Sequence, residues 1–116
     1  EEGYLFLVDR KKDVVIVGGY NVYPRQVDDV LFEHPSIAEA ATVGRPDSKL
    51  GEVLVAFVVP KPDASLNEAE LVAFCASRMV KYKRPVHFFF VDALPRTNAR
   101  KLDKKALKRL AATSAR

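Results

Sequence analysis

Residues 52 to 59 read Glu-Val-Leu-Val-Ala-Phe-Val-Val, one acid followed by seven apolar residues. A short run that is rich in β-branched and aromatic side chains is typical of a strand. The segment Pro60-Lys61-Pro62-Asp63 ends the run, because proline cannot donate a backbone hydrogen bond to a sheet. The sequence therefore predicts a strand over 52–59, the clearest in the chain.

The residues just upstream predict a second strand and a helix. Ile37–Val43 is apolar and compatible with a strand, and residues 44–51 predict a loop between the two strands. Pro24 is placed to begin a helix, and the pair His34-Pro35 ends it, because the residue before a proline avoids helical torsions.

The N-terminal segment predicts a hairpin. Tyr4–Val8 and Val14–Val17 are short apolar runs joined by the five charged residues 9–13, and Gly18-Gly19 stops the second run. We expect the two runs to pair as antiparallel strands, separate from the main sheet.

Two helices and a strand are predicted downstream. Asn67 or Ser65 can cap a helix that runs to about Met79, and Val86–Val91 predicts a further strand. The tail predicts a short amphipathic helix on Leu102, Ala106, Leu107 and Leu110.

The resulting order, β-β-α-β-β-α-β-α, predicts an α+β fold. We expect a small N-terminal β-hairpin followed by a three-stranded sheet packed with helices, mainly on one face. Within one domain of 116 residues we distinguish a hairpin region (1–22), an α+β core (23–93) and a basic tail (94–116).

Composition and charge exclude several classes of protein. Cys75 is the only cysteine, so a disulfide scaffold is excluded, and with only two histidines a Cys/His zinc site is disfavoured. No apolar run approaches the roughly 20 residues of a membrane span and no signal-peptide pattern opens the chain, so we expect a cytoplasmic protein without indicated membrane association. Because the chain begins Glu1-Glu2 without an initiator Met, we expect a piece of a longer protein.

The charge is concentrated at the C-terminus. Residues 1–95 hold eleven basic and fourteen acidic residues, a net −3, whereas residues 96–116 hold eight basic and one acidic residue, a net +7. A nucleic-acid partner is disfavoured, because the tail has no aromatic residue for base stacking. Its short aliphatic stripe favours docking on the protein's own core. Cys75 and the run Phe88–Phe90 are likewise predicted to be core residues.

Three features have both a structural and a functional interpretation on the residues alone. Gly18-Gly19 is either a turn or a place where a ligand approaches the backbone closely. The cluster Arg10-Lys11-Lys12-Asp13 is either a solvated tip or a charged hinge or anion site. Lys101 is either a solvated tail residue or a cation for a developing oxyanion or phosphate. The structural interpretation is the more common one in each case.

Three blocks in collinear order resemble the C-terminal domain of the adenylate-forming (AMP-binding) superfamily, most closely that of acyl- and aryl-CoA synthetases. The blocks are Gly3-Tyr4-Leu5 … Asp9-Arg10-Lys11-Lys12-Asp13 … Gly18-Gly19-Tyr20-Asn21-Val22-Tyr23-Pro24, then His34-Pro35-Ser36-Ile37 … Val43-Gly44-Arg45-Pro46-Asp47 … Gly51-Glu52, and Tyr82-Lys83-Arg84-Pro85 … Leu94-Pro95-Arg96-Thr97 … Lys101. The resemblance covers essentially the whole chain.

The resemblance implies an acid–thiol ligase that works in two steps. A carboxylate attacks MgATP to give an acyl-adenylate, and CoA then displaces AMP. It also implies a large N-terminal domain of the same enzyme, absent from these 116 residues. That domain would bind most of the ATP, Mg²⁺ and carboxylate, and the chain by itself would be inactive. The small domain would rotate between the two half-reactions.

The resemblance also implies roles for six residues. Lys101 matches the catalytic lysine of adenylate formation, Arg10 and Asn21 match nucleotide contacts, and Lys12 matches the hinge. Gly18 and Gly19 match the glycines that the pantetheine arm of CoA approaches.

The sequence departs from the family pattern at Arg100, and two alternatives to the CoA synthetase function stay open. Arg100 stands where the family usually has glycine before the lysine, which puts the path of that loop in question. Within the family, the rival is an acyl-AMP ligase that delivers its adenylate to a carrier protein. Outside it, the rival is a standalone basic binding or regulatory module.

Overall fold

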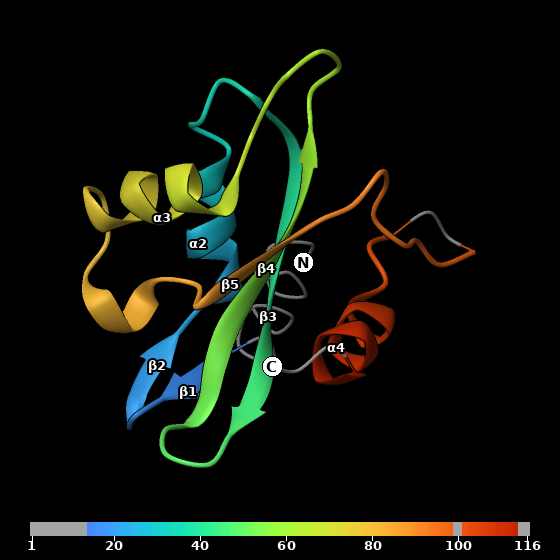
Figure 1. The fold of residues 1–116 in the computed structure, drawn as a ribbon. Helices are drawn as coiled ribbons and strands as arrows, with labels where there is room; N and C mark the ends of the chain where they lie inside the picture. The colour runs from blue at the N-terminus through green and yellow to red at the C-terminus, as the bar shows by residue number, and fades with distance from the viewer. Residues whose placement is uncertain (1–13, 99–100, 114–116) are drawn as a thin grey trace, which may run out of the picture.

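The computed structural model describes residues 14–98 and 101–113, and these build one five-stranded sheet with helices on both faces (Figure 1). In chain order the elements are β1 (Val15–Val17), β2 (Tyr20–Val22), α2 (Pro24–Leu31), β3 (Ile37–Asp47), β4 (Gly51–Pro60), α3 (Glu68–Ala76), β5 (His87–Phe90) and α4 (Lys104–Thr113). The strand order is β2-β1-β4-β3, and β5 pairs with β4 as well. The α+β class predicted from the sequence is confirmed.

Strands β3 and β4 form the long antiparallel centre of the sheet. The register pairs Val43 with Val55, and Asp47 with Gly51. Strand β3 therefore continues through most of the predicted 44–51 loop, and the turn is confined to residues 48–50. The Asp47 carboxylate closes that turn, because Oδ2 accepts from the backbone N–H of Leu50 at 2.9 Å.

The loop prediction was wrong because Gly44 and Pro46 are strand residues here. A Cβ on Gly44 would lie 2.8 Å from Glu52 Oε2 and 3.0 Å from Val15 Cγ2, so glycine leaves room for these two side chains. Pro46 lies on β3, which is an edge strand of the sheet, where proline is tolerated.

The described residues contain a hairpin that the sequence did not predict. Strand β1 pairs with β2 through the two-residue turn Gly18-Gly19, and Val17 also pairs with Gly51 of β4. The hairpin is therefore part of the main sheet and not separate from it. The predicted partner Tyr4–Val8 lies outside the described residues.

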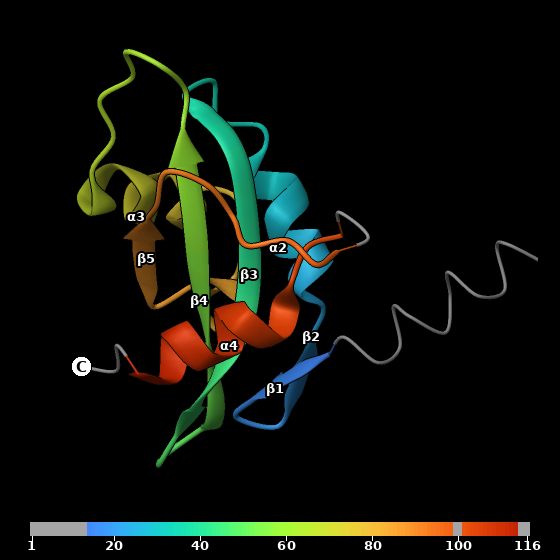
Figure 2. The same ribbon diagram turned by 90° about the vertical axis from the view of Figure 1, so that its right-hand side faces the viewer.

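Two apolar clusters lie on opposite faces of the sheet, one under α2 and α3 and the other under α4 (Figure 2). The α2/α3 cluster comprises Val15, Val17, Val22, Val27, Leu31, Ile37, Ala40, Leu54, Ala56, Val58, Leu71, Cys75 and Phe88. The α4 cluster comprises Ala41, Val43, Val55, Phe57, Leu94, Leu107 and Ala111. The predicted docking of the tail helix on the protein's own core is confirmed.

The helices are shorter than their sequence patterns. Helix α2 ends at Leu31 and not at His34, whose Nδ1 accepts from the Ser36 N–H at 3.1 Å in the following turn. Helix α3 ends at Ala76 and is capped by Asn67, whose Oδ1 accepts from the Glu70 N–H at 2.8 Å. Of the two predicted caps, Asn67 is the one used. No helix in the described part of the chain is long and apolar enough to cross a membrane.

The residues of α3 and β5 that were predicted to lie in the core differ in how far they are buried. Cys75 is buried, and burial raises the pKa of its thiol to about 11 against the opposing effect of Arg84 and Arg78. Phe88 is buried as predicted, whereas Phe90 at the end of β5 is 40% exposed.

Candidate functional site

The Gly18-Gly19 turn joins β1 to β2 at one end of the sheet. Both residues have positive φ, +56° and +91°, which suits the two-residue hairpin turn that glycine favours. Gly18 N–H donates to Leu50 O at 2.9 Å, and a Cβ on Gly18 would lie 3.1 Å from Leu50 Cδ2. A Cβ on Gly19 would have no atom within 4 Å. Gly19 therefore presents an open backbone surface.

Two tyrosines lie beside this turn. The ring of Tyr20 on β2 stacks on that of Tyr82 with 4.1 Å between centroids. Tyr82 belongs to the short 3₁₀ helix Lys81–Lys83. Asn21, the next residue on β2, is exposed and opposes Ile16. The tyrosine stack was not predicted, because its partners are far apart in sequence and only the sheet brings them together.

Lys101 lies in a hydrogen-bonded loop between β5 and α4. This loop, which begins at Arg96 and ends at Leu102, is called the lysine loop. Arg96 and Leu102 form an antiparallel bridge, and the Thr97 N–H donates to Lys101 O at 2.7 Å. The Lys101 side chain is exposed. Arg100, the residue that departs from the family pattern, lies outside the described residues. The loop thus carries an accessible ammonium on a closed base.

Both ends of the lysine loop are attached to β3. Arg96 pairs with Glu39 of β3 at 2.8 Å, and Lys104 Nζ donates to Thr42 O of β3 at 2.8 Å. Asp103 Oδ1 accepts from the Ala106 N–H at 3.1 Å and so caps α4.

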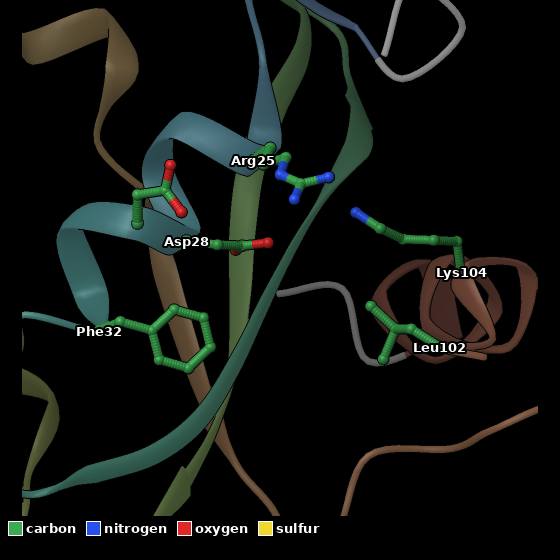
Figure 3. A pocket seen from close by; sticks show the side chains of 6 residues that line it. Arg25, Asp28, Phe32, Leu102 and Lys104 are labelled. Atoms are coloured by element: carbon green, nitrogen blue, oxygen red, sulfur yellow. The ribbon is translucent and has the colours of Figure 1, made fainter. Parts of the chain in front are cut away.

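A cleft of about 300 Å³ lies between α2 and the start of α4. Figure 3 shows Arg25 and Asp28 of α2 on one side, and Lys104 and Leu102 on the other. Phe32 lies at the α2 side of the cleft. Both charge signs border it, so the cleft offers no purely cationic or anionic site.

The predicted site residues fall into two separate places. The Gly18-Gly19 turn and the Lys101 loop lie on opposite sides of the molecule (Figure 1). Arg10 and Lys12 lie outside the described residues. In the described ranges 14–98 and 101–113, no three or more metal-ligating side chains gather at one place. The domain thus carries its glycine turn and the loop of Lys101 on different sides, and its described residues hold no metal cluster.

Residues 26–101 match the model of a family described as AMP-binding enzyme C-terminal domain. The chain is 48% identical over 110 residues to a 2-succinylbenzoate–CoA ligase of Geobacillus kaustophilus, covering 95% of this chain and 22% of that protein. It is 46% identical over 107 residues to a long-chain-fatty-acid–CoA ligase of Bacillus subtilis, covering 92% and 19%. The chain thus spans about a fifth of the length of the curated relatives it matches.

Solved structures agree with these relatives. A fatty acyl CoA synthetase of Mycobacterium tuberculosis matches with a TM-score of 0.81 and 35% identity over 89% of this chain and 20% of that one. An o-succinylbenzoate CoA synthetase of Bacillus subtilis, in complex with its acyl-adenylate intermediate, matches with a TM-score of 0.77 and 40% identity over 90% and 20%.

Proposed function

The chain belongs to the family of AMP-binding enzyme C-terminal domains, and on that premise we propose that it is the mobile C-terminal domain of an ATP-dependent acyl- or aryl-CoA synthetase. The observation that carries the proposal is the exposed Lys101 on a closed loop. The family resemblance assigns this residue as the catalytic lysine. The N-terminal domain of the same enzyme would be its partner, and the enzyme would act in the cytoplasm.

The proposed reaction has two half-reactions. A carboxylate oxygen attacks the α-phosphorus of ATP, the bond to the β-phosphate oxygen breaks, and pyrophosphate leaves. The CoA thiol then attacks the acyl carbon, loses its proton and displaces AMP, which leaves a thioester. Following the family resemblance, Mg²⁺ and most ATP contacts are assigned to the N-terminal domain.

Lys101 acts in the first half-reaction. Negative charge develops on the phosphate and carboxylate oxygens as pyrophosphate leaves, and a positioned ammonium stabilises that charge. Lys101 is exposed, so its ammonium is accessible to a substrate held by another domain. Arg10 is assigned to the nucleotide, and Asn21 to the bound adenylate or to CoA.

The glycine turn acts in the second half-reaction. Gly19 leaves its backbone open, which suits close approach of the thin pantetheine arm of CoA. The turn and the loop that carries Lys101 lie on opposite sides of the molecule (Figure 1), which supports their being presented to the active site one at a time. Rotation about Lys12, the assigned hinge, would present them in turn.

The test is Lys101→Ala in the full-length enzyme that carries this chain. We expect pyrophosphate release to fall about a thousandfold, because an electrostatic contact of the transition state is lost. Thioester formation from supplied acyl-adenylate and CoA should stay within about threefold. Lys105→Ala, which removes an exposed cation from α4, is the matched control and should change neither rate.

The substrate panel follows the relatives and includes 2-succinylbenzoate and long-chain fatty acids. Equal loss of both half-reactions in Lys101→Ala would contradict the assignment of the two surfaces. Transfer of the acyl group to carrier-protein pantetheine but not to CoA would identify an acyl-AMP ligase. No pyrophosphate release with any acid would return the chain to the class of binding modules.

A further inference from the structure

The N-terminal side of the lysine loop is attached to β3 by an ion pair. Arg96 Nη2 lies 2.8 Å from Glu39 Oε1, and the two side chains are 46% and 43% exposed. Arg96 also makes the backbone bridge to Leu102 that closes the loop. The ion pair therefore holds Arg96, the residue at which the loop begins. Leu102, at which the loop ends, is bridged to that same residue.

The C-terminal side of the loop is attached to the same strand. Lys104 Nζ donates to Thr42 O at 2.8 Å, and this hydrogen bond is partly buried. The Asp103 N–H donates to Pro95 O at 2.9 Å, which ties the two sides of the loop to each other. A charged donor on a carbonyl acceptor is among the stronger hydrogen bonds in proteins.

Strand β3 carries both of these attachments. It pairs with β4 along nearly its whole length, and Thr42 is completely buried. Glu39 and Thr42 are three positions apart on the strand, so both attachments lie over one short stretch of it. The ends of the lysine loop are thus fixed to the most extensively paired part of the sheet.

We propose that Glu39, Arg96 and Lys104 are positioning residues for Lys101, which hold its loop on β3 during adenylate formation. This inference rests on the proposed function of Lys101. A long, exposed lysine side chain stabilises a transition state only when its backbone is held near the productive geometry. Two attachments to one strand restrict the loop without contacting the substrate.

The first test reverses the charges of the ion pair in the full-length enzyme. Glu39→Arg and Arg96→Glu should each lower kcat for pyrophosphate release about fivefold, the size expected for a partly exposed ion pair, with little change in KM for ATP. The double variant Glu39→Arg/Arg96→Glu should recover to within about twofold of wild type. Thioester formation from supplied acyl-adenylate should be unchanged in all three.

Two further variants complete the comparison. Lys104→Met keeps the aliphatic stem but removes the donor to Thr42 O, and should lower kcat about threefold. The control is Glu33→Arg, which breaks another exposed ion pair and should leave pyrophosphate release unchanged. In that pair Glu33 Oε1 lies 3.6 Å from Arg78 Nε. Thermal unfolding of each variant shows that it is folded.

A background without the lysine separates positioning from general stability. Adding Glu39→Arg to Lys101→Ala should lower adenylation no further, because the ion pair acts through Lys101. A further fivefold loss, or equal losses in both half-reactions, would overturn the positioning role.

Deuterium exchange of the segment 96–102 tests the attachment without relying on activity. Exchange should rise severalfold in each single charge reversal and return in the double variant. Unchanged exchange would overturn the attachment. Full adenylation by Lys101→Ala would instead overturn the proposed function, so the two failures are distinguishable.

Discussion

The glycine turn and the lysine loop present their functional groups by different physical means. The turn is built from backbone torsions of two adjacent residues, Gly18 and Gly19, both in the positive-φ region. The lysine loop is held by contacts that join Arg96 to Glu39 and Lys104 to Thr42, 57 and 62 positions apart in sequence. One is local, and the other depends on the assembled sheet.

This difference predicts which substitutions would disrupt the glycine turn and which would disrupt the lysine loop. A turn whose shape is set by φ tolerates few side chains, but its loss leaves the rest of the sheet intact. A loop held by distant contacts depends on the residues that fix its two ends to β3. The lysine loop is therefore sensitive to changes on β3 and α4 that never touch the substrate.

The largest expected effect comes from blocking the proposed rotation that would exchange the two surfaces. Lys12→Pro in the full-length enzyme should lower the CoA half-reaction about a thousandfold and spare adenylation, because proline fixes φ at the assigned hinge. Separate assays of pyrophosphate release and of thioester formation measure the split. Lys12→Ala keeps the torsions free and serves as the control. Unimpaired overall turnover in Lys12→Pro would mean that Lys12 is no hinge.

The next effect concerns the support of the lysine loop. Leu107 of α4 is completely buried against the sheet, so Leu107→Ala should lower the free energy of unfolding by about 3 kcal/mol. Leu110 on the same helix is 47% exposed, and Leu110→Ala should cost no more than about 0.5 kcal/mol. Urea unfolding of the chain measures both. Equal losses would show that α4 is not seated through Leu107.

The smallest effect tests the glycine turn. Gly19→Asn adds a side chain where CoA is proposed to approach, at a φ of +91° that side chains rarely adopt, and should lower thioester formation about tenfold. Gly18→Asn directs its side chain toward Leu50 and gives an Asn-Gly turn, which hairpins favour, so the CoA step should stay within about threefold. Kinetics with supplied acyl-adenylate compare the two variants. A greater loss in Gly18→Asn would place the CoA approach at Gly18 and contradict the role given to Gly19.

Local sequence signals predicted the elements whose stability is local. The apolar run of β4 and the Asn67 cap of α3 needed only neighbouring residues to be recognised. Gly44 and Pro46 predicted a loop, because their usual meaning is local. In the folded chain Gly44 leaves room for the side chains of Glu52 and Val15, and Pro46 lies on an edge strand. Both facts depend on how the strands are arranged in the sheet.

The candidate site was predictable to the same extent. The family pattern pointed to Lys101, Gly18 and Gly19, but nothing local indicated that Glu39 would meet Arg96 or that Tyr20 would stack on Tyr82. Each pair joins distant segments, and distant pairing is decided by the register of the sheet.

By itself the sequence determined the α+β class, the family, the concentration of positive charge in the tail and the presence of a lysine in its final loop. Tertiary structure decided that the hairpin joins the main sheet, that the tail helix covers the opposite face from α2 and α3, and that β3 supports the lysine loop. The physical reason is that apolar patterns and backbone torsions act between neighbouring residues. Ion pairs, ring stacking and strand neighbours form only after distant segments share one buried core.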